Sequence, residues 1–343
     1  MKKIVLFNHK GGVSKTTSTL NIAWKIADMG HRVLLVDADP QCNLTGMLMG
    51  MEDYEKYYED EETRAINIKE GVSNAFSSSL NPIQAVRCVT NPRNPNLFLI
   101  PGSVDLSNYD SQLNFAMTTA STMPVMQGLP GSFNTLIEET AASVNAEYVF
   151  IDLNPGLSAI NQTLFLTCDA FIIPTTPDLF SLMAVKSLAI ALTRWMDWKK
   201  ENIHYFEKAV YPFPTVTPKF IGFITQRFNV RNGEATRPFK DKIQEIKDYI
   251  STDLIEIIKR NDMAFSDEKY RQCHIPEDFL LCEIKDFQGL APKSTKAKVP
   301  VFALTNDELE VVGAPLTVQA ANRDEFSTKY DMIANYIISL LND

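Results

Sequence analysis

The sequence predicts an α/β fold in which a doubly wound, mostly parallel sheet is flanked by helices. Three apolar runs, residues 4–7, 33–36 and 148–151, each lead directly into polar residues. Parallel strands are buried on both faces, so they read as continuous apolar runs with polar residues at the carboxyl end. A helical segment over residues 16–29, ended by Gly30, separates the first two runs, as a strand-helix-strand unit requires.

The first strand leads into a glycine-containing turn, Asn-His-Lys-Gly-Gly-Val-Ser-Lys-Thr-Thr over residues 8–17, which opens the following helix. Unpaired backbone N–H groups at such a turn, together with the helix dipole, attract a polyphosphate. Lys15 adds a full positive charge, and the hydroxyl of Thr16 is a ligand for the Mg2+ that accompanies ATP. The turn therefore predicts an ATP site made by Gly11, Gly12, Val13, Ser14, Lys15, Thr16 and Thr17.

Carboxylates follow the other two strands. Asp37 and Asp39 come after residues 33–36, and Asp152 follows residues 148–151. Ligands of doubly wound folds collect outside the carboxyl ends of the strands, so these carboxylates are expected to face the same crevice as Lys15. Each motif alone also fits a capped turn after a strand. The three motifs in one chain together indicate a nucleotide site with a metal ion.

The pattern K-G-G-x-x-K-T, from Lys10 to Thr16, resembles the deviant Walker A motif of the ParA/MinD family of P-loop ATPases. Within this family the chain looks most similar to DNA partition ATPases of the ParA/Soj type. Two positions depart from the family pattern: Ser14 stands where glycine is usual, and Asn154 stands in the D-x-P-P motif after the third strand. The resemblance covers nearly the whole chain and implies a P-loop NTPase fold.

The resemblance also implies catalytic roles and cofactors. Lys15 neutralises phosphate charge in its own subunit, Lys10 reaches the phosphates of a partner subunit, and Asp39 orients or activates the attacking water. The cofactors implied are ATP and Mg2+, and the residues implied in the Mg2+ shell are Thr16, Asp37 and Asp152.

A contact with the nucleotide base is expected from the loop after another strand. Residues 220–224 form an apolar run that ends near Gln226 and Arg227. In related ATPases this loop, and a later segment resembling residues 299–302, help to enclose the base. Solvated side chains after a strand are an equally good interpretation of Gln226 and Arg227.

The chain is expected to be a single P-loop ATPase domain over residues 1–343, although its length alone permits two domains. An acidic insertion is predicted at about residues 50–96, because residues 51–62 contain seven carboxylates and one lysine. Such a run is usually a solvated loop or helix face, and docking of a basic partner is the alternative. Residues 118–133 are expected to form a loop, and residues 324–341 a final amphipathic helix packed on the core.

The overall charge of -9 and pI near 5.1 argue against a strongly basic nucleic-acid binder. The segment 219–247 nevertheless has a local excess of positive charge, and a basic face there is as good an interpretation as ordinary solvated helices. Its basic residues are Lys219, Arg227, Arg231, Arg237, Lys240, Lys242 and Lys247. No charged leader precedes an apolar region and no run of eighteen apolar residues occurs, so a cytoplasmic protein without a membrane partner is expected. The resemblance to the ParA type implies that it is also associated with the nucleoid.

The function predicted by the resemblance is an ATP-dependent partition ATPase. ATP binding drives formation of a homodimer, the dimer binds DNA without sequence preference, and a ParB-like activator stimulates the hydrolysis that resets it. Two alternatives remain open. One is a positioning or regulatory switch whose cargo is a protein assembly, and the other is a metabolic P-loop enzyme of the cobyrinic acid or dethiobiotin synthase type.

Overall fold

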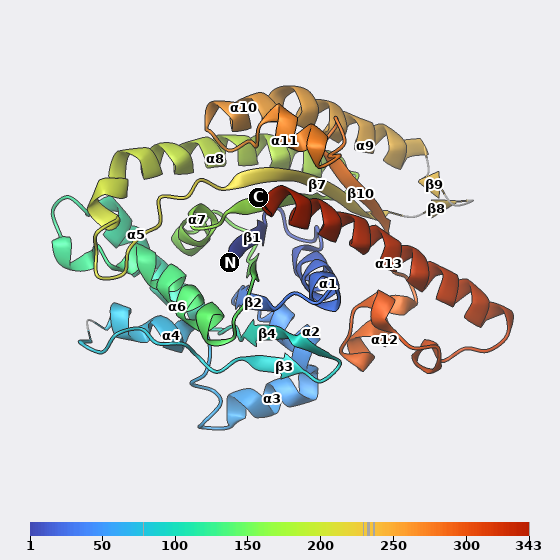
Figure 1. Ribbon diagram of the computed structural model, residues 1–343, viewed down its shortest axis with the longest axis horizontal. Helices are drawn as coiled ribbons and strands as arrows, with labels where there is room; N and C mark the ends of the chain where they lie inside the picture. Colours follow the sequence, from blue (N-terminus) through green and yellow to red (C-terminus); the bar gives the residue numbers. More distant parts are fainter. Residues whose placement is uncertain (78, 229, 232–233, 236, 343) are drawn as a thin grey trace.

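A parallel sheet forms the centre of the molecule. The computed structural model describes residues 1–77, 79–228, 230–231, 234–235 and 237–342, except for the side chains of residue 51 and of residues 230–238. Within the described chain, eight strands form one sheet in the order β10-β7-β6-β1-β5-β2-β4-β3 (Figure 1). All neighbouring strands are parallel except β3 and β4. The predicted fold class is therefore confirmed.

The strands of this sheet are β1 Lys2–Leu6, β2 Val33–Ala38, β3 Val89–Asn91, β4 Asn94–Ile100, β5 Tyr148–Leu153, β6 Ala170–Thr175, β7 Lys219–Phe228 and β10 Leu280–Lys285. The short strands β8 Val230–Arg231 and β9 Glu234–Ala235 pair with each other outside it.

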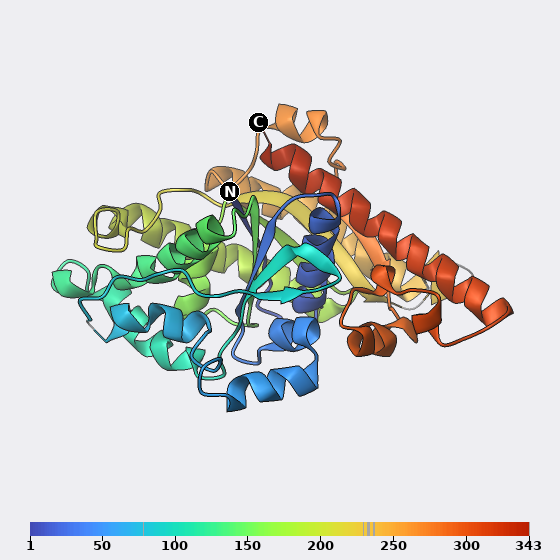
Figure 2. The same cartoon turned by 60° about the horizontal axis from the view of Figure 1, so that its bottom comes forward.

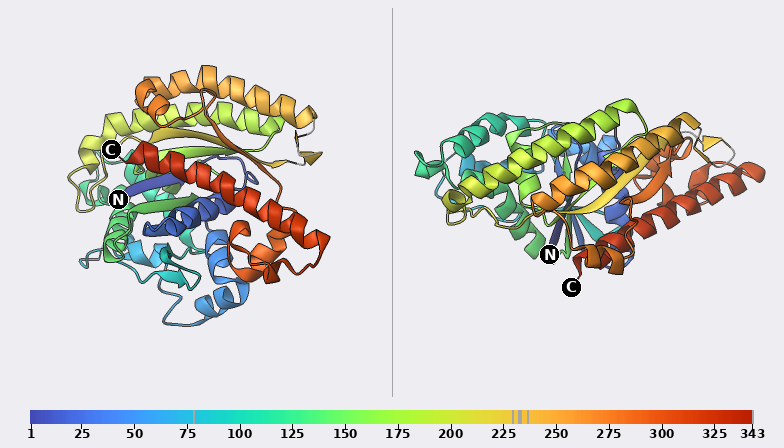
Figure 3. Two further views of the ribbon diagram at one scale, coloured as in Figure 1. Left: turned by 45° about the vertical axis from the view of Figure 1, so that its right-hand side comes forward. Right: turned by 90° about the horizontal axis from the view of Figure 1, so that it is seen from above.

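Helices cover both faces of the sheet (Figures 2 and 3). On one face α1 packs against α13, and Trp24 and Tyr330 from these helices share a core with the sheet. On the other face Phe133 of α6, Phe165 of α7 and Trp195 of α8 belong to a second core. Two apolar cores separated by a sheet that is buried on both sides explain why the central strands consist mostly of apolar residues.

The α-helices are α1 Lys15–Asp28, α2 Asn43–Met49, α3 Met51–Glu59, α4 Ile68–Phe76, α5 Asp110–Thr118, α6 Leu129–Ser143, α7 Ala159–Leu166, α8 Leu179–Phe206, α9 Arg237–Tyr249, α10 Ile255–Arg260, α11 Asp267–Gln272, α12 Leu290–Ala297 and α13 Ala314–Leu341. Short 3-10 helices lie at Leu106–Tyr109, Pro124–Met126, Val301–Ala303 and Asp307–Leu309, and a π-helical turn lies at Ile250–Leu254.

Two predicted boundaries were wrong. The final helix α13 begins at Ala314, ten residues before the expected start at residue 324, and Leu316 and Ala320 in its first turns are partly buried against the core. The expected loop 118–133 already contains the start of α6 at Leu129, because Pro130 occupies the first turn, where a missing N–H costs nothing. The predicted insertion at 50–96 contains α3, α4 and β3, and its delimitation stays a prediction.

Helix α8 is long and apolar enough, by length and composition, to cross a membrane. It is the one helix of this kind among the described residues, and half of its most apolar 18-residue stretch is buried within the protein. Core helices of soluble proteins commonly meet the same criteria, so the finding is weak evidence for a membrane span.

The sheet register brings the predicted site residues to one edge. β5 lies between β1 and β2, with Asp152 opposite Leu6 on one side and opposite Asp37 on the other. The turn after β1 and the carboxylates of β2 and β5 therefore meet at the carboxyl end of the sheet, as parallel topology requires.

Candidate nucleotide-binding site

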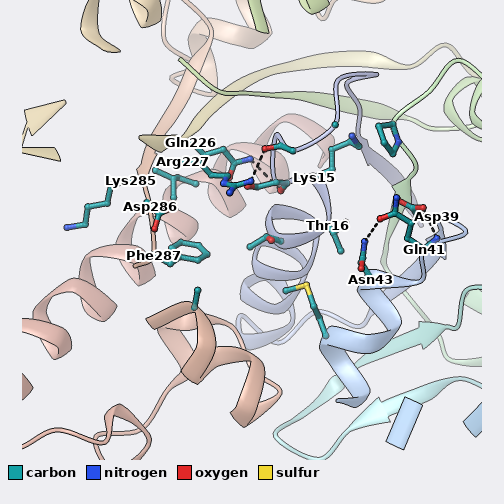
Figure 4. A pocket seen from close by; sticks show the side chains of 18 residues that line it. Lys15, Thr16, Asp39, Gln41, Asn43, Gln226, Arg227, Lys285, Asp286 and Phe287 are labelled. Carbon is teal, nitrogen blue, oxygen red and sulfur yellow. Dashed lines mark hydrogen bonds between the residues drawn. The ribbon is translucent and has the colours of Figure 1, made fainter. Parts of the chain in front are cut away.

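The turn between β1 and α1 forms one wall of a cavity of about 540 Å3 (Figure 4). Gly12 and Ser14 both adopt the left-handed backbone conformation, with φ of 75° and 56°. A left-handed conformation costs an L-residue roughly 1–2 kcal/mol, which gives a physical reason for glycine to be usual at the position of Ser14. The turn and first helical residues line the cavity with Gly11, Gly12, Ser14, Lys15, Thr16 and Thr17, whereas Val13 is buried behind it.

Lys15 is held inside the turn. Its side chain lines the cavity, the residue is only 7% exposed, and its Nζ donates a hydrogen bond of 3.1 Å to the carbonyl oxygen of Lys10. Burial lowers the pKa of Lys15, while Asp152 and Asp39 act in the opposite direction. A buried ammonium with one main-chain partner has unused donors, and these are available to a phosphate.

Asp152 is buried without partners. Both of its carboxylate oxygens lie out of contact with solvent, and neither has a hydrogen-bond partner. Burial raises its pKa well above the usual range, and the neighbouring charge of Asp37 adds to this. The hydroxyl of Thr16 lies near enough to lower that pKa, although it does not meet the geometry of a hydrogen bond. Two orphaned carboxylate oxygens beside a hydroxyl fit a hard cation such as Mg2+.

Asp39 lies at the cavity wall. It is 5% exposed, and its Oδ1 accepts a hydrogen bond of 2.9 Å from the backbone N–H of Gln41. One carboxylate oxygen thus fixes the turn after β2, while the side chain still borders the space where a ligand would lie. This geometry suits a group that orients a water molecule.

Asp37, like Asp152, is fully buried and does not line the cavity, so its expected place in the Mg2+ shell stays a prediction. Its Oδ2 accepts hydrogen bonds from the backbone N–H and the hydroxyl of Thr45, at 2.8 and 2.6 Å. Burial raises the pKa of Asp37 to about 6, against the lowering effect of these bonds. Asp37 therefore anchors α2 and adds negative charge beside Asp152. Its carboxylate already accepts hydrogen bonds, whereas the carboxylate of Asp152 has no partner.

In this structure the side chain of Lys10 is bound within its own subunit. Its Nζ donates to both carboxylate oxygens of Asp178, at 2.7 and 2.6 Å, and to the hydroxyls of Thr176 and Ser181, each at 2.9 Å. Burial acts to raise the pKa of Asp178, but the bonds from Lys10, Thr176 and Ser181 prevail and lower it. The expected contact of Lys10 with a partner's nucleotide requires this ion pair to open.

Gln226 faces the P-loop and braces it. It is 2% exposed, its Oε1 accepts from the hydroxyl of Ser18 at 2.8 Å, and its Nε2 donates to the carbonyl oxygen of Val13 at 2.8 Å. Both ends of its amide are thus used within the protein, which leaves little capacity for a base. Arg227 is exposed, and its guanidinium donates to the carbonyl oxygen of Gly12 at 3.1 Å, at the open side of the cavity.

The opposite wall of the cavity comes from the end of β10 and from α12, which sequence reasoning missed. The residues that line it are Ile284, Lys285, Asp286, Phe287 and Ala291 (Figure 4). By contrast, Val299 and Val301, in the segment expected to enclose the base, are buried in the core under α13. The apolar run over residues 279–282, at the start of β10, was the available signal, because β10 is another parallel strand with polar residues at its carboxyl end.

The basic face expected over residues 219–247 stays a prediction, although two of its described residues lie far apart. Lys219 and Arg227 lie toward opposite ends of β7, about 26 Å apart at ~3.3 Å per residue. Lys219, Lys242 and Lys247 form ion pairs with Asp262, Glu245 and Asp278 respectively. The side chains of Arg231 and Arg237 lie outside the described residues.

A strand, an anion-binding turn with a buried lysine and a helix-borne hydroxyl, and a carboxylate on the neighbouring strand define a P-loop nucleotide-binding protein. An AAA domain family model (AAA_31) matches residues 1–205, which is more than half of the chain. The chain therefore belongs to this family, and it is a P-loop ATPase of the ParA/MinD type.

Curated relatives match over part of their length. An uncharacterized protein of Mycobacterium tuberculosis is 31% identical over 196 residues, which cover 57% of this chain and 53% of that protein. The chromosome partitioning protein ParA of Caulobacter vibrioides is 26% identical over 195 residues, covering 57% of this chain and 63% of that protein. The chain thus spans about half to two thirds of the length of these relatives.

Solved structures share the fold over nearly the whole chain. The McdA(D38A)-ATP complex of Cyanothece superposes with a TM-score of 0.58 at 18% identity, covering 94% of this chain and 96% of that one. A putative plasmid partition protein of Borrelia burgdorferi bound to AMPPNP has a TM-score of 0.53 at 20% identity, covering 96% and 98%. At these identities the likeness concerns the fold alone.

Proposed function

We propose that this protein binds Mg-ATP in the cavity at the carboxyl end of the sheet and hydrolyses it as a molecular switch. The observation that carries the proposal is the pair of unpartnered, buried oxygens of Asp152, which face the hydroxyl of Thr16 beside the ammonium of Lys15. A buried carboxylate that accepts no hydrogen bond destabilises the folded protein unless a cation binds to it. The fold neighbours in complex with ATP and AMPPNP support a nucleotide as the ligand.

The side chains around the cavity have different proposed roles in ATP hydrolysis. Lys15 and the backbone N–H groups of the turn would hold the phosphates, and Thr16 and Asp152, with Asp37 beside them, would hold the metal ion. Mg2+, when bound, neutralises charge on the phosphate oxygens. Asp39 orients the water that attacks the terminal phosphate, because its carboxylate borders the cavity and its other contacts are to its own turn.

Dimerisation around the nucleotide is part of the proposal. Lys10 belongs to the K-G-G-x-x-K-T motif, and its ammonium lies at the surface beside the turn, 21% exposed at the side chain. The partner of Lys10, Asp178, is 41% exposed at the side chain, so the phosphates of a second subunit would replace Asp178 as the contact of Lys10 once these hydrogen bonds open. ATP would then hold two subunits together, and hydrolysis would release them.

The cargo proposed is DNA, with a ParB-like activator that stimulates hydrolysis. The support is the similarity to the chromosome partitioning protein of Caulobacter vibrioides and to the Borrelia plasmid partition protein. The setting proposed is the cytoplasm, on the nucleoid, with no membrane partner.

The test is binding to random-sequence duplex DNA in Mg-ATP and in Mg-ADP, over a series of salt concentrations. The proposal predicts ATP-dependent binding that weakens steeply with salt, since phosphate contacts dominate such affinity. Lys15→Ala is the matched control and should bind no DNA in either nucleotide. Equal binding in ATP and ADP, or binding insensitive to salt, would contradict a nucleotide-switched DNA cargo.

A protein cargo is the second candidate, and one observation favours it. The described lysines Lys219, Lys242 and Lys247 of the expected basic segment are all engaged in ion pairs. If the wild-type protein hydrolyses ATP but binds DNA neither in Mg-ATP nor in Mg-ADP, a protein cargo is favoured over DNA partition.

A further inference from the structure

The loop between Asp152 and α7 is held by a single buried side chain, Asn161. Asn161 is fully buried, and its Nδ2 donates hydrogen bonds to the carbonyl oxygen of Asn154 at 3.0 Å, to the Oδ1 of Asn154 at 3.0 Å and to the carbonyl oxygen of Gly156 at 2.9 Å. An amide nitrogen has two hydrogens, so three acceptors share them. The opposite amide orientation would place Oδ1 against three oxygens, so the contacts themselves fix which end of the carboxamide faces the loop.

This loop touches the nucleotide cavity. It directly follows β5, which carries Asp152, and its Pro155 lines the cavity. Pro155 also faces the P-loop, because a Cβ built on Gly11 would lie 3.8 Å from the Cγ of Pro155. A change in the backbone of residues 154–156 is therefore transmitted to the wall that surrounds the phosphates.

Asn161 is itself anchored on both sides. Its backbone N–H donates to the hydroxyl of Ser158, the residue that caps α7. The neighbouring backbone N–H of Ile160 donates to the Oδ1 of Asp110 on α5, at 3.0 Å. The carboxamide thus projects from a fixed helix end into a loop that has few other constraints, and its own Oδ1 is buried without a partner.

We propose that Asn161 is a positioning residue for recognition of the terminal phosphate of the nucleotide. It holds the carbonyl groups of Asn154 and Gly156 so that the loop keeps one conformation against the P-loop. This inference rests on the proposed function, because it assigns the loop to the nucleotide that the cavity binds. The β-phosphate side of the site is made by the turn itself, so a disturbed loop should affect ATP more than ADP.

The test compares affinities for Mg-ATP and Mg-ADP in wild type, Asn161→Ala and Asn161→Asp by calorimetric titration. Alanine removes the three hydrogen bonds, and aspartate keeps the shape while directing a carboxylate at three acceptors. Affinity for ATP should fall about tenfold, equivalent to ~1.4 kcal/mol, whereas affinity for ADP should change less than twofold. A merely structural role would lower both affinities together.

Asn261→Ala is the matched control, because Asn261 is also buried and its Nδ2 bonds to Ile257 and Thr193 between α8 and α10. It should leave the ATP-to-ADP affinity ratio at the wild-type value. If the Asn161 variants do not fold, Asn154→Ala decides the question, since it deletes one of the three acceptors and should lower the ratio in the same direction to a smaller extent.

An unchanged ratio in folded Asn161 variants, or in Asn154→Ala if those do not fold, overturns the assignment of Asn161 and leaves nucleotide binding standing. Failure of the wild-type protein to bind either nucleotide overturns the proposed function instead. The two failures are therefore distinguishable.

Discussion

Replacing Asp152 by asparagine should stabilise the protein in the absence of nucleotide and metal. The carboxylate is fully buried, lacks any hydrogen-bond donor and lies near the charges of Asp37 and Asp39. Asparagine has almost the same shape and removes the charge. A buried carboxylate that destabilises the folded protein and lies where a cation can bind is expected at a position that is selected for function and not for stability.

The size of the gain follows from the charge, because asparagine is also a buried polar group without partners at this position. A buried polar group without a hydrogen bond costs about 1–3 kcal/mol, and more when it is charged. With an unfolding entropy of about 2.1 cal/mol/K per residue, a gain of ~2 kcal/mol over 343 residues raises the Tm by about 3 °C.

The gain should also depend on pH with a defined sign. Burial raises the pKa of Asp152 in the folded protein, so the folded state takes up a proton more readily than the unfolded state does. The stability of the wild type therefore rises as the pH falls from the folded pKa of Asp152 to its ordinary value of 3.8 in the unfolded chain. Asp152→Asn has no group that titrates there. The advantage of the variant should be largest at high pH and should fade on acidification.

The assay is thermal unfolding in EDTA at several pH values, followed by the same measurement in Mg-ATP. Asp169→Asn is the control, because the Oδ2 of Asp169 accepts a 2.7 Å bond from the backbone N–H of Lys3 and its charge is partnered. The control should not gain stability. In Mg-ATP the order should reverse, with wild type stabilised and Asp152→Asn little changed. A variant that is no more stable than wild type in EDTA at pH 7.5 would refute the reasoning.

Three further predictions follow from the contacts around the site. Asp39→Ala should keep ATP affinity within about threefold and lower turnover by about a hundredfold or more, the usual scale for loss of a group that assists proton transfer, in a steady-state phosphate-release assay; wild-type turnover would contradict the role assigned to Asp39. Gln226→Ala removes the bond to Ser18 and the brace on the P-loop, so it should cost about 1–3 kcal/mol in chemical denaturation and weaken ATP and GTP equally; a loss selective for ATP over GTP would indicate a base contact instead. Asp178→Asn loosens Lys10 and should shift the ATP-dependent monomer–dimer equilibrium toward dimer in analytical ultracentrifugation; an unchanged equilibrium would show that the ion pair does not oppose dimerisation.

Local patterns were enough to predict much of the fold and the phosphate side of the site. The apolar runs of β2 and β5, the turn before Lys15 and the carboxylates that follow these strands are all contiguous in sequence. Topology then forces them to one edge, because parallel strands end on the same side of a sheet. The positions of Lys15, Asp39 and Asp152 needed no information beyond this.

Contacts between distant residues decided the rest. Lys10 lies 168 residues from Asp178, and Gln226 lies 208 residues from Ser18, so neither partner is visible in a local pattern. The hydrogen bonds from Thr45 to Asp37 depend on the placement of α2, which the sequence did not predict. Phe287 was missed for the same reason, because its wall of the cavity depends on the pairing of β10 with β7.

Calorimetric titration of Mg-ATP into wild type and Lys15→Ala, with and without EDTA, tests the central claim most directly. The account predicts one nucleotide per chain in the wild type, weaker binding when EDTA removes Mg2+, and no measurable binding in Lys15→Ala. Unchanged ATP affinity in Lys15→Ala, or binding by the wild type that is indifferent to Mg2+, would contradict the assignment of this cavity as a Mg-ATP site.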